Sequence, residues 1–379
     1  MFDYETLKVI WWLFVGVLLL GFAIMDGHDM GVGTLLPFVG KNDGERRVII
    51  STVSAHWEGN QVWFITAGGA IFAAWPLVYA TAFSGFYWAM LAVLWALFFR
   101  PVGFDYRSKI ANPTWRSSWD WGLFIGGAVP PLIFGVAFGN LLQGVPFHFD
   151  DDLRSYYTGT FWQLLNPFAL LAGVVSTAMI TAHGANYLMI RTEGDIYRRS
   201  RTAAILFGVL ALVAFAAAGV WVMNGIAGYL ITSGNLPNAL PNPLDKTVVV
   251  QAGAWMHNYS VYPLTIIIPV TAFVGGALAI VFALMHKPTM AFLGSSLSML
   301  GIIGTASVSM FPFIMPSSTD PRSSLTVWDS VSSHMTLELM FWATVIFLPL
   351  IVFYTSWAYK VMSGKLSVAY INGNDHSTY

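Results

Sequence analysis

Residues 56–63, HWEGNQVW, place a histidine, a carboxylate and two amides at the start of a long apolar run. Ionisable side chains are costly where a chain enters a bilayer, so their presence there indicates a functional site. If the run is helical, Trp63 lies about 7.5 Å deeper than Glu58, at about 1.5 Å per residue. We therefore interpret the segment as a polar entrance with an aromatic residue behind it.

The composition indicates which kind of secondary structure must position these residues. The chain has 379 residues, of which 56% are hydrophobic and 10% charged, whereas soluble domains have about 25% charged residues. This predicts an all-α polytopic membrane protein embedded in a lipid bilayer. The absence of cysteine excludes thiolate metal sites and disulfides. The net charge of −1 argues against nucleic acid as a partner.

Apolar runs long enough to cross a bilayer, about 20 residues each, recur along the chain. The acidic start of the chain favours a retained first span over a cleaved signal peptide. Nine transmembrane helices are predicted, at residues 9–33, 56–75, 79–100, 122–143, 162–190, 203–231, 261–286, 289–314 and 336–361.

The distribution of Lys and Arg orients the predicted spans. Loops on the N-terminal side hold 4 of the 18 basic residues, and loops on the opposite side hold the other 14. Because basic residues concentrate on the cytoplasmic side, we expect the N-terminus outside and the C-terminal Tyr379 inside.

With this orientation, ionisable residues gather at the cytoplasmic ends of the first three spans. Neighbouring carboxylates, imidazoles and amines could pass protons in short steps, so the group suits a proton intake. The alternative is a set of interfacial charges that pair with one another and with loop backbone. The residues concerned are Asp26, His28, Asp29, His56, Glu58, Arg100, Asp105 and Lys109.

The histidines give no strong metal motif. His183 could in principle bind haem or another metal, but no second ligand lies at a helical spacing beside it. His28 and His56 stand beside carboxylates, which favours proton handling over metal binding. We therefore expect no metal site in this chain.

Four motifs resemble those of subunit II of cytochrome bd ubiquinol oxidase. They are residues 26–33 (DGHDMGVG), 56–63 (HWEGNQVW), 99–107 (FRPVGFDYR) and 311–318 (FPFIMPSS). The resemblance keeps the order and approximate spacing of the motifs and extends from the first residues to Tyr379.

This resemblance implies nine spans arranged as two four-helix bundles and one peripheral helix. The chain would form a single integral membrane domain, 1–379. Its first bundle would cover about residues 1–145, the remaining helices would cover 160–361, and a short cytoplasmic tail would follow at 362–379.

The resemblance also implies a function within a complex. Members belong to a terminal oxidase of aerobic respiration in the bacterial cytoplasmic (inner) membrane. Such a complex oxidises ubiquinol or menaquinol, reduces O2 to water and generates proton motive force. The partner, subunit I, would carry two haems b and haem d, and small single-span accessory subunits would complete the assembly. A structural quinone bound to this chain is also compatible with the resemblance.

Carried over by position, the resemblance assigns a cytoplasmic proton pathway to Glu58, Asp105, Lys109 and Tyr379. Relatives have Asp at position 58. Glu58 keeps the carboxylate and adds one methylene. Trp63 matches the residue at the mouth of a lateral O2 path. Supporting positions in the pathway would be Asp26, His28, Asp29, His56 and Arg100.

Two other classes of function remain open from the residues alone. A secondary transporter or ion channel could also combine many spans with buried carboxylates, although the Gly and Pro interruptions form no clear inverted repeat. A structural scaffold could cover subunit I without any pathway of its own.

Overall fold

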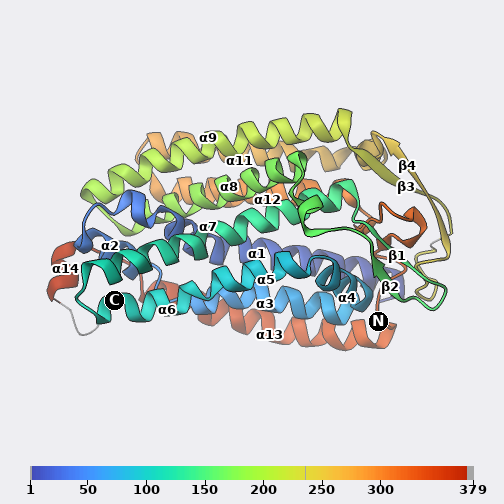
Figure 1. The fold of residues 1–379 in the computed structure, drawn as a ribbon, viewed down its shortest axis with the longest axis horizontal. Coiled ribbons are helices and arrows are strands. Elements are labelled where there is room, and N and C mark those ends of the chain that lie inside the picture. Colours follow the sequence, from blue (N-terminus) through green and yellow to red (C-terminus); the bar gives the residue numbers. More distant parts are fainter. Residues whose placement is uncertain (1, 235, 374–379) are drawn as a thin grey trace.

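The computed structural model describes residues 2–234 and 236–373, so Tyr379 lies outside the described residues. Long helices run roughly along one axis, with the N-terminus and short strands at one end and α2, α6 and α14 near the other (Figure 1). The shorter helices are α2 (Asp43–Ser51), α4 (Pro76–Gly85), α5 (Tyr87–Leu97), α6 (Phe99–Tyr106), α10 (His257–Val261) and α14 (Val368–Gly373). Short 3-10 turns include η1 (Arg107–Lys109).

Within the described residues, eight helical segments are long and apolar enough to cross a membrane. They are α1 (Tyr4–Val39), the segment Tyr87–Lys109, α7 (Pro113–Gln143), α8 (Pro167–Arg191), α9 (Gly194–Gly225), the segment Pro263–Leu284 that contains α11 (Ile267–Leu284), α12 (Pro288–Met310) and α13 (His334–Val361). The mostly helical membrane fold is thereby confirmed, and eight of the nine predicted spans are found.

The remaining predicted span, 56–75, corresponds to α3 (Trp57–Ala74), an 18-residue helix. At about 1.5 Å per residue it extends about 27 Å, and it lies between α5 and α13 (Figure 1). It does not belong to the eight segments because its polar first turn reduces its apolar character.

Two predicted spans extend too far at their ends. The span predicted at 203–231 ends as a helix at Gly225, and the one predicted at 289–314 ends at Met310. In both places the chain continues into a strand, because a partner strand supplies the backbone hydrogen bonds that further helical turns would have made.

Three two-stranded antiparallel sheets lie at the N-terminal end of the molecule (Figure 1). The all-α prediction did not include them. The pairs are β1 (Phe147–Phe149) with β2 (Ser155–Tyr157), β3 (Ala227–Gly234) with β4 (Lys246–Ala252), and β5 (Phe313–Met315) with β6 (Leu325–Thr326).

Helix α1 runs through the middle of the bundle and packs against α3, α7 and α8 (Figure 1). Its approach to α8 depends on two glycines, since a Cβ on Gly31 would lie 2.9 Å from Cα of Gly184. Small residues at such contacts let helix backbones approach closely inside a membrane. This contact fixes the part of α1 that carries the DGHDMGVG motif.

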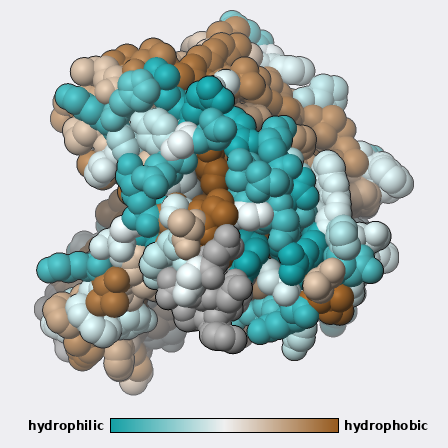
Figure 2. All heavy atoms as spheres, turned by 90° about the vertical axis from the view of Figure 1, so that its left-hand side faces the viewer, coloured by the Kyte–Doolittle hydropathy of each residue, from teal (hydrophilic) through white to brown (hydrophobic). Residues whose placement is uncertain are grey.

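Ion pairs join the helices at the end opposite the strands, where hydrophilic residues gather on the surface (Figure 2). Asp120 on α7 pairs with Arg46 at 2.8 Å and with Arg107 at 2.6 Å. Asp43 on α2 pairs with Arg107 at 3.0 Å and with Arg116 at 2.5 Å. The sequence analysis had not singled out either carboxylate.

The strand end is fixed by two buried lysines. Lys8 on α1 donates to the backbone carbonyls of Pro237 at 2.7 Å, Trp328 at 2.9 Å and Ala239 at 3.3 Å. Lys246 on β4 pairs with Asp329 at 2.9 Å, and burial lowers the pKa of the Lys246 ammonium.

Candidate functional site

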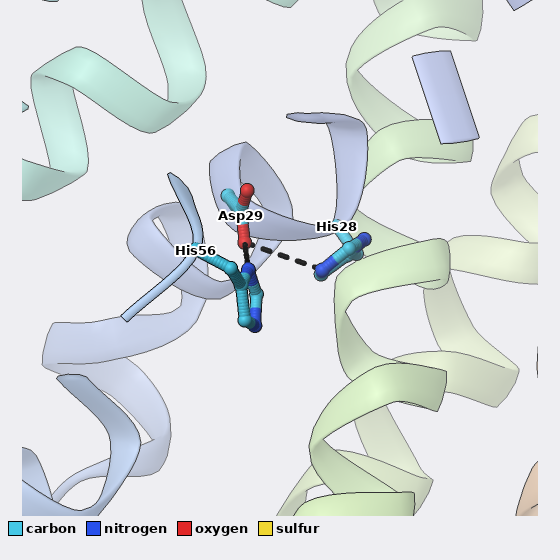
Figure 3. Close-up of side chains that lie close together, drawn as sticks. All are labelled: His28, Asp29 and His56. Carbon is cyan, nitrogen blue, oxygen red and sulfur yellow. Dashed lines mark ion pairs between the residues drawn. The ribbon is translucent and has the colours of Figure 1, made fainter. Parts of the chain in front are cut away.

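A buried carboxylate lies between two histidines near the polar end of the bundle (Figure 3). Asp29 Oδ1 is 3.2 Å from His28 Nε2 and 3.5 Å from His56 Nδ1. His28 and Asp29 belong to α1, and His56 immediately precedes α3. We call these three residues the inner cluster; the sequence analysis had grouped them, and the structure brings them together.

Each histidine of the inner cluster is held by its outward-facing ring nitrogen. His28 Nδ1 lies 3.0 Å from the carbonyl oxygen of Ile24. His56 Nε2 lies 3.2 Å from the carbonyl oxygen of Thr52 and 2.9 Å from the hydroxyl of Tyr187. The other nitrogen of each ring therefore faces Asp29.

Two further polar residues complete the surroundings of the inner cluster. Asn60 Nδ2 donates to Asp29 Oδ2 at 2.7 Å and to Tyr359 Oη at 2.6 Å. Asn60 belongs to the HWEGNQVW motif, whereas Tyr359 comes from α13 and carried no sequence signal. The sequence analysis had missed Tyr187 and Tyr359, because only the folded arrangement of helices places them here.

Asp26 and Arg100 form a separate buried pair beside the inner cluster. Arg100 donates from Nη1 and Nη2 to the two oxygens of Asp26, at 2.9 and 2.5 Å. The guanidinium carbon also lies 5.3 Å from the ring centroid of Trp57. A bidentate pair of this kind is strong and geometrically specific, and it ties α1 to α6.

Glu58, Asp105 and Lys109 lie on the outside of the chain. Glu58 and Asp105 each follow a residue of the ring contact between Trp57 and Phe104, whose centroids are 5.2 Å apart. This contact brings the start of α3 beside α6. Within the described part of the chain, no hydrogen bond or ion pair joins the three side chains to each other. We call Glu58, Asp105 and Lys109 the outer row.

Trp63 is half-buried on α3 and lies over α1. Its ring leaves no space for a side chain at Gly21, where a Cβ would be 2.5 Å from Cε3 of Trp63. It packs with an apolar cluster that includes Phe22 and Phe64. Its surroundings are therefore apolar, in contrast with the polar residues one turn earlier.

His183 does not fit the role of a haem ligand. Its Nδ1 lies 2.7 Å from Ser295 Oγ and its Nε2 lies 3.0 Å from the Ile24 carbonyl oxygen. Its ring stacks on Phe292 with centroids 4.3 Å apart. Both nitrogens are thus engaged in hydrogen bonds inside the helix bundle.

Comparisons with known proteins agree over nearly the whole chain. Residues 7–362 match the family described as Cytochrome bd terminal oxidase subunit II. The chain is 57% identical over 379 residues to Cytochrome bd-I ubiquinol oxidase subunit 2 of Escherichia coli (strain K12), with 100% of both chains covered. It is 32% identical over 367 residues to Cytochrome bd ubiquinol oxidase subunit 2 of Bacillus subtilis (strain 168), covering 96% of this chain and 97% of the relative.

The fold is similar to a chain of the bd oxidase from Geobacillus thermodenitrificans, with a TM-score of 0.69 and 13% identity. The similarity covers 94% of this chain and 98% of that chain. The family match and the full-length identities together show that this multi-pass membrane chain belongs to the cytochrome bd terminal oxidase subunit II family, and that it works beside a subunit I in a haem-containing quinol oxidase complex.

Proposed function

We propose that this chain supplies the cytoplasmic proton intake of its oxidase complex through the outer row of Glu58, Asp105 and Lys109, together with Tyr379. Reduction of O2 to water consumes protons, and a bare charge crosses hydrocarbon at high cost. Ionisable side chains at the membrane surface reduce that cost by binding protons close to where they are used. The exposure of the outer row, beside the ring contact between Trp57 and Phe104, is the observation that carries the proposal.

The outer row differs from the other charges nearby because its carboxylates are available to exchange protons. A carboxylate in a bidentate pair, such as Asp26 with Arg100, has both oxygens occupied by its partner and is a poor proton carrier. Glu58 and Asp105 have no such partner within the described residues and can bind and release protons. We propose that Asp26, His28, Asp29, His56 and Arg100 support the pathway by fixing the start of α3 and the local electric field.

We further propose that Trp63 lies at the lateral opening through which O2 reaches the complex. An apolar gas partitions from lipid into apolar surroundings, and Trp63 belongs to an apolar cluster beside exposed Val62 and Ile65. The polar outer row and the apolar surroundings of Trp63 would then separate the routes of the two reactants along one helix.

We propose the remaining features of the complex because the chain belongs to this family. The two haems b and haem d, which provide electron transfer to O2, would belong to subunit I, in agreement with the occupied nitrogens of His183. Ubiquinol or menaquinol would be the electron donor, and single-span accessory subunits would join. The end with α2, α6 and α14 would face the cytoplasm of the bacterial inner membrane, and the N-terminus would lie outside.

The helix arrangement proposed for this chain has nine spans, with α3 as the ninth. Residues 1–145 would form one four-helix bundle, and the helices within 160–361 would form the second bundle and a peripheral helix. Helix α13 supports the assignment of a peripheral helix, because Leu337 is its one buried residue within the described part of the chain. Residues 362–379 would form a cytoplasmic tail.

A structural quinone, if this chain holds one, has a candidate location. An apolar groove of about 680 Å³ runs between α1, α7, α8 and α9. Its lining includes Leu35, Phe38, Phe124 and Leu206, with Lys41 and Arg199 among its charged residues. Such a lining suits a long apolar molecule.

The proton intake is tested with Glu58→Gln and Asp105→Asn in the purified complex. Each substitution preserves the approximate size of the side chain and removes its ability to exchange a proton. We expect quinol-dependent O2 consumption to fall about tenfold or more while the haem absorption spectrum is retained, since a positioned proton-transfer group typically contributes about 10²–10⁴-fold.

Asp151→Asn provides the control, because Asp151 is an exposed carboxylate at the strand end of the molecule. It should leave turnover unchanged. Full turnover in both outer-row variants would reject the intake and favour a scaffold role for the chain.

A further inference from the structure

The inner cluster places three lone pairs opposite one another. The outward nitrogens, His28 Nδ1 and His56 Nε2, face backbone carbonyl oxygens, which can only accept hydrogen bonds. The Tyr187 hydroxyl, 2.9 Å from His56 Nε2, donates its hydrogen to the same Thr52 carbonyl and can only accept from the ring. These nitrogens must therefore carry the ring hydrogens, so in the neutral rings His28 Nε2 and His56 Nδ1 are lone-pair atoms. Both face Asp29 Oδ1, which is buried and has no hydrogen-bond partner within the described residues.

The neighbouring amide does not remove this conflict. Asn60 Nδ2 has two hydrogens and three acceptors within reach: Asp29 Oδ2 at 2.7 Å, Tyr359 Oη at 2.6 Å and His56 Nδ1 at 3.0 Å. Asp29 Oδ1 is not among them. A buried acceptor without a partner costs about 1–3 kcal/mol, so the arrangement calls for a positively charged occupant.

The distances fit a metal ion. In a tetrahedral site with bonds of about 2.0–2.1 Å, neighbouring ligand atoms lie about 3.3–3.4 Å apart. The carboxylate oxygen lies 3.2 and 3.5 Å from the two inward nitrogens. Tyr359 Oη lies 3.5 Å from His28 Nε2 and 3.4 Å from His56 Nδ1. These four ligand-to-ligand distances match four of the six edges of such a tetrahedron.

We propose that His28 Nε2, Asp29 Oδ1 and His56 Nδ1 bind one divalent first-row transition metal ion, with Tyr359 Oη beside the fourth position. Two imidazoles and a carboxylate suit Zn²⁺ and its neighbours better than Mg²⁺ or Ca²⁺. Metal-bound histidines generally donate their second ring nitrogen to a carbonyl or carboxylate, and both histidines here do so. The ion would tie α1, the start of α3 and α13 together.

The site is buried but close to the surface. The side chains of His28 and Asp29 are 1% and 0% exposed, whereas that of His56 is 7% exposed. An ion would therefore reach the cluster from the His56 side. The proposal gives three of the residues that support the proton intake a role in binding metal, but it requires none of the outer-row residues, and zinc content tests it separately from turnover.

The test measures metal content in the intact complex. The complex is depleted with a chelator, equilibrated with ZnCl2 and freed of excess ions before elemental analysis, in which zinc is counted separately from haem iron. We expect about one zinc per complex in the wild type, and less than about a tenth of that in His28→Ala and Asp29→Asn, each of which removes a ligand. His183→Ala is the matched control, since it removes another buried imidazole outside the cluster and should leave the zinc content unchanged.

A second measurement needs no variant to fold. X-ray absorption at the zinc edge of the wild-type complex should show nitrogen and oxygen neighbours at about 2.0–2.2 Å, with an imidazole pattern and no sulfur. A wild-type complex without zinc after equilibration would overturn the proposal and assign the inner cluster a shared proton instead. Equal zinc in the wild type and in folded His28→Ala would overturn it as well.

Discussion

The first turn of α3 has two faces that differ in almost every physical respect. Asn60 and the preceding His56 point to Asp29 and join a buried set of hydrogen bonds. Glu58, two residues before Asn60, is exposed. Residues two apart lie on nearly opposite sides of a helix, so one short motif contributes His56 to the inner cluster and Glu58 to the outer row.

The difference shows that ionisable residues close in sequence need not share a role. On the inner side, Arg100 holds Asp26 by hydrogen bonds of 2.9 and 2.5 Å and Asn60 donates to Asp29 Oδ2 at 2.7 Å, so removing a partner leaves a buried group uncompensated. Charges on the outer face have no ion-pair or hydrogen-bond partner within the described chain and can change protonation at little structural cost. Loss of stability is therefore the expected effect of inner substitutions, and loss of turnover that of outer ones.

The largest effect is expected for Arg100→Met. It leaves the buried carboxylate of Asp26 without its bidentate partner, and breaking a buried ion pair in this way costs about 3–5 kcal/mol. The thermal midpoint of the purified complex measures the loss. Lys109→Met, an exposed cation of the outer row, should change stability by no more than about 0.5 kcal/mol. Equal losses in the two variants would erase the distinction between the faces.

A smaller loss is expected for Asn60→Leu. The substitution removes the donor to Asp29 Oδ2 and Tyr359 Oη, and an unsatisfied buried polar group costs about 1–3 kcal/mol. The side chain of its neighbour Gln61 makes no hydrogen bond within the described residues, so Gln61→Leu is a suitable comparison. An unchanged thermal midpoint for Asn60→Leu would show that the inner hydrogen bonds contribute little to stability.

The smallest effect is expected for Glu58→Asp. The carboxylate is retained and recedes by one methylene on an exposed face, so turnover should stay within about twofold of wild type and stability within about 0.5 kcal/mol. Oxygen consumption by the purified complex measures the first quantity. A loss as large as that of Glu58→Gln would mean that the position of the carboxylate matters as much as its charge.

Much of this arrangement could be predicted from the sequence, because hydrophobic runs and polar motifs are local signals. The lengths of the apolar runs predicted eight of the spans, and the motifs placed Asp29, His56 and Arg100 near one another. The same signals also failed to separate Glu58 from the inner cluster, since that requires the rotational phase of α3 against α1.

Contacts between distant segments could not be predicted. Tyr359 reaches the inner cluster from the last long helix, and Asp120 pairs with Arg107 across two elements. The strands also escaped prediction, because each pair joins short segments separated by loops and its hydrogen bonds depend on register. The length of the apolar run likewise placed the end of α9 too late, since the chain pairs as a strand after Gly225.

The anchoring of Lys8 has a consequence for the order in which the molecule is made. Lys8 lies in the first turns of the first helix, but the carbonyl oxygens that accept from it belong to Pro237, Ala239 and Trp328. Because synthesis proceeds from the N-terminus, this ammonium group waits for its permanent partners until nearly the whole chain has left the ribosome. The strand end of the subunit therefore closes last, and a truncated chain leaves its first helix with an unsatisfied charge.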